Sequence, residues 1–291
     1  MDDWDKAGKI SAQILNFGKK LIKVDSNVLE VVEKIESEIK KTEGLPAFPV
    51  QVSMNEMAAH FTPNDENDLK FKDGDLVKLD VGVHVNGFIG DNALTVDLGE
   101  NKELSKASEM ALKEAIKLAK PGVKIYQIGE VIEKTISEFG FKPIKNLSGH
   151  GIEQYEPHSG LTIPNYNNND NFELQDDQII AIEPFASDGI GLVGDGKPSN
   201  IYKVVNVKQV RNDITRDILR YIIKEYKTLP FARRWLLKKF DSFRVNFALR
   251  MLEKESILHH YPQLPEKSKG LVSQHEYTLR VKDSPVILTR E

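Results

Sequence analysis

The sequence predicts an α+β fold in which two similar α/β halves are related by a pseudo-twofold axis. The first observation is a β-hairpin signal, because Asn86-Gly87 lies between runs of β-branched residues. The second is a repeated pattern, since residues 71–80 and 172–183 each place an acidic turn before an apolar strand that ends in a carboxylate. The third is that two helical stretches precede each copy, which indicates a duplicated unit.

The elements of each half follow in the same order along the chain. Apolar residues recur at helical spacing, and a Pro-punctuated strand region then leads into the acidic turn. We expect a binding site at the junction of the two halves. The predicted helices are Asp5–Leu21 and Ser26–Thr42 in the first half, and Glu103–Lys120 and Ile125–Phe139 in the second.

The hairpin brings two aspartates onto one face of the first half. Side chains alternate along a strand, so Asp80 and Gly82 share a face, and Asp91, opposite Gly82, is a diagonal neighbour of Asp80. Two carboxylates directed at one point repel each other unless a cation lies between them, and Gly82 leaves room for that cation. The register that this requires pairs His84 with Ile89, Gly82 with Asp91, and Asp80 with Ala93.

The simpler interpretation of the hairpin is a solvated face with two ordinary surface aspartates. His84 lies on the same face but next to the turn, so we interpret it as a polar residue of the hairpin end and not as a ligand.

Three further candidate ligands stand in informative local sequences. His150 lies in a stretch punctuated by glycines, where the backbone can approach a site closely. Glu183 ends an apolar run, and a carboxylate at the end of a buried strand is costly unless it is paired or bound to a metal. Glu276 opens another strand, whereas His275 beside it faces the opposite way, which favours a structural role.

Asp80, Asp91, His150, Glu183 and Glu276 together form a set of four carboxylates and one imidazole. Such a set suits two hard or borderline divalent cations held close together. A pair of cations of this kind activates a water at neutral pH and stabilises both ends of a hydrolytic transition state. The set therefore predicts a metal-dependent hydrolase.

These local sequences resemble the five-ligand signature of the methionine aminopeptidases, whose fold is called the pita-bread or creatinase-like fold. The resemblance covers essentially all 291 residues. The motifs that carry it are Asp80-Val-Gly-Val-His-Val-Asn-Gly-Phe-Ile-Gly-Asp91, Gly149-His150-Gly-Ile, Ile182-Glu183-Pro-Phe and Gln274-His-Glu276.

The long segment between Glu183 and Glu276 is similar to that of the type 2 enzymes, whose catalytic core carries an inserted helical subdomain. The resemblance implies a catalytic domain of residues 1–192 plus 271–291 and a winged-helix-like insert of residues 193–270. No long charged segment precedes the first helix, so the resemblance is to the archaeal form.

The resemblance also implies an activity, which is removal of the N-terminal methionine from nascent proteins whose second residue is small. The centre would hold two divalent metal ions, Co, Mn, Fe or Zn, with a metal-bridging hydroxide. Glu183 would be a proton shuttle as well as a ligand. His60 and His158 match the family's two non-ligand histidines, which hydrogen-bond the substrate and stabilise the developing oxyanion.

The resemblance further assigns a pocket for the methionine side chain. By spacing alone its residues would be assigned to the core, and the lone histidines to structural roles. One departure is Pro157, which stands before His158 where an aliphatic residue is common. The positions that match the pocket are Phe48, Phe185, Ile201 and Tyr261.

Composition narrows the remaining classes of function. A content of 40% hydrophobic and 29% charged residues is typical of a globular protein in water. The net charge of −4 gives no indication of a polyanionic partner, and no apolar run is long enough to predict a membrane span. The acidic start lacks the apolar segment of a signal peptide and the chain has no cysteine, so we expect a cytoplasmic monomer that acts on the N-terminal peptides of nascent proteins.

The segment from Lys208 to Lys269 is basic, with 15 Lys and Arg against 7 Asp and Glu. One interpretation is a winged-helix-like module that touches ribosomal RNA or the nascent chain. We favour a solvated basic face on a subdomain that walls the active site, with at most weak contact to the ribosome. The predicted helices of this segment are Arg211–Tyr226, Ala232–Phe240 and Asn246–Glu255.

Two alternative functions remain open at this point. One is a proline-directed aminopeptidase of the same fold, although such enzymes usually carry a large extra N-terminal domain. The other is a non-catalytic relative that binds RNA or the ribosome, although all five ligands are present here. Turnover of a Met-Gly-Xaa peptide by the metal-loaded protein distinguishes these two alternatives from a methionine aminopeptidase.

Overall fold

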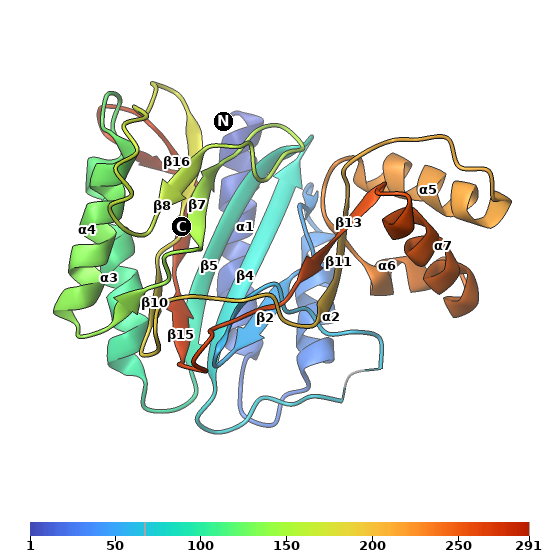
Figure 1. Ribbon diagram of the computed structural model, residues 1–291, viewed down its shortest axis with the longest axis horizontal. Helices are drawn as coiled ribbons and strands as arrows, with labels where there is room; N and C mark the ends of the chain where they lie inside the picture. The colour runs from blue at the N-terminus through green and yellow to red at the C-terminus, as the bar shows by residue number, and fades with distance from the viewer. Residues whose placement is uncertain (67, 291) are drawn as a thin grey trace.

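The computed structural model describes residues 1–66 and 68–290, and its centre is an antiparallel sheet of nine strands (Figure 1). The strands are β1 (Leu45–Pro46), β2 (Gln51–Met54), β4 (Leu76–Val85), β5 (Phe88–Asp97), β7 (Ser148–Gly151), β8 (Thr162–Pro164), β9 (Ile179–Ile182), β16 (Glu276–Arg280) and β17 (Val286–Ile287). Their order is β1-β4-β5-β16-β9-β7-β8, while β2 also pairs with β4 and β17 with β16. The late strand β16 therefore lies between strands of the first and second halves.

The four helices predicted for the two halves are confirmed to within one turn at each end. The first is capped by Asp2, whose side chain accepts a hydrogen bond from the Asp5 backbone, and the second is capped by Asn27 in the same way. No helix in the described part of the chain is long and apolar enough to cross a membrane. The four helices are α1 (Asp3–Leu21), α2 (Val28–Ile39), α3 (Lys102–Leu118) and α4 (Ile125–Glu138).

Each half has its own hydrophobic core. In the first, Ile14 of α1 and Ile35 of α2 pack with Leu79 and Val81 of β4. In the second, the helices α3 and α4 pack with β9 and with Leu279 of β16. Figure 1 shows α1 behind β4 and β5, with α3 and α4 at the left of the sheet. The predicted α+β fold with duplicated halves is confirmed.

The register predicted for the first hairpin is also confirmed. Asn86 and Gly87 form the turn with φ values of 51° and 90°, and left-handed backbone at both positions suits a two-residue hairpin turn. The pairs across it are His84 with Ile89, Gly82 with Asp91, and Asp80 with Ala93.

Two small sheets connect the main sheet to the walls of the site. They contain β6 (Lys142–Pro143), β10 (Phe185–Ser187) and β15 (Val272–Gln274) in one, and β3 (Met57–Ala59) and β14 (Leu264–Pro265) in the other. The Asn55 carbonyl, in the turn before β3, accepts hydrogen bonds from the buried Lys78 Nζ at 2.7 Å and from the Val272 backbone at 3.1 Å. This carbonyl ties β4 and β15 to the turn that leads to His60.

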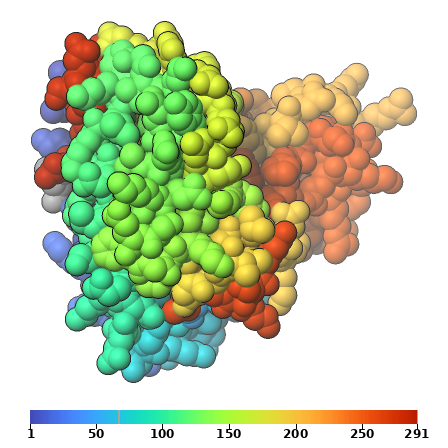
Figure 2. All heavy atoms as spheres, turned by 60° about the vertical axis from the view of Figure 1, so that its left-hand side comes forward, coloured from blue at the N-terminus to red at the C-terminus, as the bar shows by residue number. Residues whose placement is uncertain are grey.

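The segment between β10 and β14 folds around a third core, separate from those of the two halves. It stands to one side of the sheet in Figure 1, and behind the green helices α3 and α4 in Figure 2. Its elements are β11 (Pro198–Val204), α5 (Asp213–Tyr226), β12 (Phe231–Ala232), α6 (Arg233–Leu237), α7 (Ser242–Lys254) and β13 (Leu258–Pro262).

The helix expected at Arg211–Tyr226 is confirmed, whereas the boundaries expected for the next two were wrong. The helix α6 ends at Leu237 and not at Phe240. The helix α7 begins at Ser242 and not at Asn246, because the Asp241 side chain accepts a hydrogen bond from the Arg244 backbone at 3.0 Å and caps it.

A buried cluster fastens this helical segment to the first half. Arg234 of α6 forms an ion pair with Glu36 of α2, and both side chains are almost fully buried. The indole Nε1 of Trp235 donates to the same carboxylate at 2.8 Å, and Arg234 also donates to Thr62 Oγ1 at 2.9 Å. Breaking a buried, hydrogen-bonded ion pair is costly, so the helical segment is held firmly against α2.

Candidate metal centre and substrate cavity

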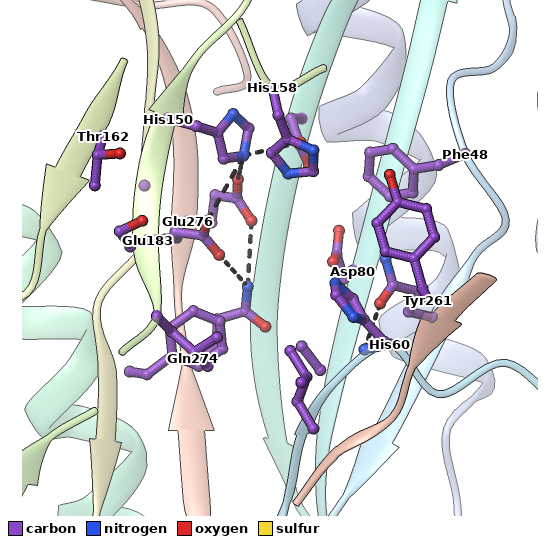
Figure 3. Close-up of a pocket in the computed structure, with 18 of the residues that line it drawn as sticks. Phe48, His60, Asp80, His150, His158, Thr162, Glu183, Tyr261, Gln274 and Glu276 are labelled. Carbon is purple, nitrogen blue, oxygen red and sulfur yellow. Dashed lines mark hydrogen bonds and ion pairs between the residues drawn. The ribbon is translucent and has the colours of Figure 1, made fainter. Parts of the chain in front are cut away.

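The five candidate ligands line one cavity of about 360 Å³ at the junction of the two halves. Figure 3 shows His150, Glu183 and Glu276 on one side of this cavity and Asp80 on the other. The Nε2 atom of His150 lies 3.6 Å from Glu183 Oε1, 3.8 Å from Asp91 Oδ2 and 4.0 Å from Glu276 Oε1. Residues separated by almost two hundred positions in the chain thus meet in one place.

Burial changes the protonation of all four carboxylates. It is the largest cause that raises the pKa of Asp80, to about 7, and it raises the pKa of Asp91, Glu183 and Glu276 well above the usual range. The negative charges of neighbouring carboxylates raise the last three further. Burial also lowers the pKa of His150 to about 4, which keeps its imidazole neutral and able to ligate.

Three carboxylate oxygens in the cluster are buried with no hydrogen-bond partner among the described residues: Asp80 Oδ1, Asp91 Oδ1 and Glu276 Oε1. Unpaired buried oxygens of this kind are strongly disfavoured. Donor atoms of Asp91, His150 and Glu276 lie within 4.8 Å of one another, close enough to hold a metal ion. These residues therefore fit divalent cations, whose charge would offset that of the carboxylates.

Two residues to which the sequence analysis assigned no role hold the ligands in place. The Thr278 hydroxyl accepts from the Asp91 backbone N–H and donates to the Asp91 carbonyl, each at 2.8 Å. The Gln274 amide donates to Glu183 Oε2 at 3.2 Å and to Glu276 Oε2 at 3.3 Å (Figure 3). Both stand two positions from Glu276 along β15 and β16, and this spacing was a signal that could have identified them.

His60 lies at the opposite side of the cavity, in a left-handed backbone conformation with φ 65°. Its backbone N–H donates to Gln51 Oε1 at 2.7 Å, and its Nδ1 lies 3.0 Å from the Pro262 carbonyl. Because a carbonyl can only accept, Nδ1 carries the proton in this bond, and Nε2 is left as an acceptor. Burial lowers the pKa of His60, which favours this neutral form.

His158 packs edge-on against His150, with ring centres 4.2 Å apart. Burial is the largest cause that lowers its pKa well below the usual range, and the neighbouring histidines and Lys203 add to the effect. Both non-ligand histidines thus line the cavity as neutral rings.

The four residues expected to form an apolar pocket all line the same cavity, and Phe48, Phe185 and Ile201 are almost fully buried. Tyr261 stands edge-on to His60 at 5.2 Å between ring centres. Five further apolar residues, which the sequence did not indicate, also line the cavity: Ala59, Leu147, Leu161, Pro230 and Leu264.

The expectation that Gly82 leaves room for a cation was wrong. A Cβ atom at position 82 would lie 2.2 Å from Phe48 Cε1, so the aromatic ring of Phe48 fills the space beside this glycine. A cation would instead lie toward His150. Because His150 is on β7, the sequence of the hairpin alone could not predict this position.

Two other histidines lie outside this cavity, as expected. His84 accepts a hydrogen bond from the Gly87 backbone through Nδ1 at 3.2 Å, which makes it a hairpin-end residue. His275 faces away from Glu276, and its Nδ1 is hydrogen-bonded to Ser108 of α3 at 2.9 Å.

Comparisons with known proteins agree with this site. The sequence matches metallopeptidase family M24 over residues 3–214. It is 44% identical to the methionine aminopeptidase of Archaeoglobus fulgidus, with 98% of this chain and 96% of that one covered, and 44% identical to that of Pyrococcus abyssi, with 100% and 99% covered. The solved methionine aminopeptidase of Thermotoga maritima is 25% identical, covers 99% of this chain and 95% of its own, and superimposes with a TM-score of 0.71.

Proposed function

The chain belongs to metallopeptidase family M24 and, within it, to the methionine aminopeptidases, and we propose that it removes the N-terminal methionine from peptides whose second residue is small. It is accordingly a hydrolase and an aminopeptidase. The observation that carries this proposal is the buried cluster of four carboxylates and His150 beside an apolar pocket, because it joins hydrolytic chemistry to a site for an unbranched apolar side chain.

The ligand set supports two divalent cations held by Asp80, Asp91, His150, Glu183 and Glu276. Co, Mn, Fe and Zn all accept such ligands. When bound, the cations would activate water, polarise the scissile carbonyl and offset the charge of the carboxylates. The position of Glu183 at the end of β9, with one oxygen held by Gln274, suits a ligand that also moves a proton.

The two non-ligand histidines are proposed to bind the reacting peptide with complementary roles. His60 presents Nε2 as an acceptor, since its Nδ1–H is committed to Pro262, and so it can accept a peptide N–H. His158 is neutral and can donate a ring N–H to the oxygen that becomes negative in the transition state. Both roles require that the histidine ring lies within hydrogen-bond distance of the substrate, and neither requires contact with a metal ion.

The methionine side chain is proposed to enter the pocket formed by Phe48, Phe185, Ile201 and Tyr261. The pocket residues and the candidate ligands line the same cavity, and a second side chain beside the metal centre would have to share it, which supports a preference for a small second residue. The metal centre would bind a free α-amine, which only a chain end supplies, and this supports action on chain ends only.

The sequence distance from Glu183 to Glu276 supports assignment to the type 2 enzymes of archaeal architecture. We propose the corresponding domain division, with residues 1–192 plus 271–291 as the catalytic domain and residues 193–270 as the insert. The separate core of the helical segment supports this division. A cytoplasmic monomer that meets nascent chains, with at most weak ribosome contact, is part of the same proposal.

The test is hydrolysis of Met-Xaa-peptides by the metal-loaded protein. Peptides with Gly, Ala or Ser in second position should lose methionine much faster than those with Leu, Lys or Asp. Equal rates would contradict the specificity, and no turnover with any of the four metals would contradict the function. The protein's own Asp2 should then protect Met1, which intact-mass measurement can check.

A further inference from the structure

A second cavity of about 360 Å³ lies on the reverse side of the sheet, in a groove between α1 and α3. Side chains alternate along β5 and β16, so the neighbours of the ligands Asp91 and Glu276 point the other way. Two of these neighbours, Asn92 and Tyr277, are paired in register and line this groove. The groove thus has its floor on the strands that carry two of the candidate metal ligands.

The floor contains a hydrogen-bond donor with no partner. Asn92 is fully buried, and its Oδ1 accepts from the Ser11 hydroxyl at 2.9 Å. Its Nδ2 makes no hydrogen bond within the described residues. A buried donor left without a partner is unfavourable. An acceptor bound in the groove would provide that partner.

Cations from both helices line the same groove. Lys19 of α1 and Lys113 of α3 are exposed there, together with Arg290 from the end of the described chain. In the described part of the chain neither Lys19 nor Arg290 makes an ion pair. The one lining carboxylate is Glu109, which pairs with Lys113.

The charges of the groove affect this carboxylate. The hydrogen bond from Lys113 is the main cause that lowers the pKa of Glu109, and the charges of Lys113 and Lys19 contribute to the same shift. Three cations against one carboxylate leave a positive surplus, which favours an anion of more than one negative charge.

We propose that this groove binds a small oxyanion of the phosphate class. Asn92 Nδ2 would donate from the floor, while Lys19 and Lys113 would close on the anion from the two facing helices. A phosphate group has several acceptor oxygens and about two negative charges, which match the donors and the charge surplus. The cavity volume also admits a phosphate ester or a diphosphate.

Isothermal titration calorimetry of the metal-loaded protein with inorganic phosphate, diphosphate and adenosine monophosphate tests this proposal. Phosphates also bind metal ions, so the decisive comparison is between variants. The double variant Lys19→Ala, Lys113→Ala removes groove cations, whereas Lys20→Ala, Lys117→Ala removes two exposed lysines from the same helices outside the groove.

We expect saturable binding that is weaker by about tenfold or more in the groove variant and nearly unchanged in the control. Tighter binding of adenosine monophosphate than of phosphate would identify an ester as the ligand, and equal binding would identify free phosphate. The proposal is overturned by equal affinity in wild type and groove variant, by equal weakening in both variants, or by no binding to the wild type. Peptide turnover by the same samples tests the proposed aminopeptidase activity, so that failure of that proposal can be distinguished from failure of the groove proposal.

Discussion

The ring of Phe48 lies against the backbone of Gly82, so close that a Cβ atom at position 82 would be 2.2 Å from Phe48 Cε1. Gly82 stands between Asp80 and the hairpin turn, on the face directed at the cavity. The missing side chain therefore sets the position of the apolar pocket wall relative to the metal ligands. This contact therefore joins the aromatic wall of the pocket to the strand that carries the candidate ligand Asp80.

Gly82→Ala should raise KM for methionyl peptides by about tenfold and lower the free energy of unfolding by about 1–3 kcal/mol, because the added methyl group forces Phe48 out of its position. Metal affinity should change little, since Asp80 and Asp91 keep their register. Kinetics, metal titration and denaturant unfolding measure the three quantities. Adding Phe48→Leu should restore stability, and an unchanged KM in the single variant would contradict this contact's role.

Asp91→Asn should lower kcat/KM by roughly 100-fold or more and weaken the binding of at least one metal ion. An amide has nearly the same shape as the carboxylate but cannot supply its negative charge. The Thr278 contacts go to the backbone of residue 91, so the fold should persist. Calorimetric metal titration with unchanged stoichiometry and affinity would rule out Asp91 as a ligand.

His60→Ala and His158→Ala should each reduce kcat by roughly 100-fold while metal affinity stays close to that of the wild type. Both rings are expected to contact the substrate and not the cations. His84→Ala is a suitable control, because His84 is a buried histidine outside the cavity. Loss of metal from either variant would show that the histidines belong to the metal centre.

Tyr261→Ala should raise KM for methionyl peptides by about tenfold, equivalent to about 1.4 kcal/mol of binding free energy. The change removes an aromatic wall of the cavity and touches no ligand. Phe243→Ala removes a strongly exposed aromatic ring of the same inserted segment outside the cavity, so it provides the control and should leave KM unchanged.

The same variant also tests the alternative role of the insert. RNA affinity of the wild type should be weak and should fall steeply with salt, as for a diffuse basic surface. Tight, salt-resistant RNA binding combined with normal kinetics of Tyr261→Ala would instead favour a nucleic-acid recognition module.

The contribution of the four buried carboxylates to the stability of the metal-free protein should fall as pH rises from about 4 to 7, whereas that of the buried histidines, whose pKa values are lowered, should rise over the same window. The unfolded Asp80 carboxyl has a pKa of about 3.9, whereas burial raises its folded pKa to about 7. At Asp80 the folded state therefore binds more protons in this window and loses that advantage as pH rises through the folded pKa. The other three carboxylates shift in the same direction.

The stabilisation that bound metal provides should increase as pH rises, because the cations need ionised carboxylates. The difference in Tm between metal-loaded and chelator-treated protein should thus increase from about pH 5 to about pH 8. Differential scanning calorimetry across this range measures it. A Tm difference that is constant with pH would contradict the raised pKa values.

The sequence was sufficient where local rules determine the structure. The Asn86-Gly87 turn determines the pairing of Gly82 with Asp91, and helical spacing located α1 to α4. The ligands His150, Glu183 and Glu276 could be identified because each stands in a distinctive short motif. Their meeting in one cavity followed from the family resemblance.

The features that could not be predicted depend on packing between distant elements. Phe48 reaches Gly82 from the loop between β1 and β2, so the hairpin alone suggested an empty space there. The Gln274 amide lies between two carboxylates, one at the end of β9 and the other at the start of β16, and the ion pair between Arg234 and Glu36 joins segments almost two hundred residues apart. The start of α7, in contrast, depends on a local signal, the capping side chain of Asp241.

The position of β16 has a consequence for how the chain folds while it is being synthesised. Among the strands of the main sheet only β17 follows it in the chain, yet it lies in the middle of the sheet, between β5 and β9. Until Glu276 has emerged and docked, the two earlier parts of the sheet have nothing to join them, and the cluster lacks a ligand. Long-range closure of this kind is slow. A chain in which β16 has not yet docked would therefore lack the complete ligand set, and we expect it to be inactive.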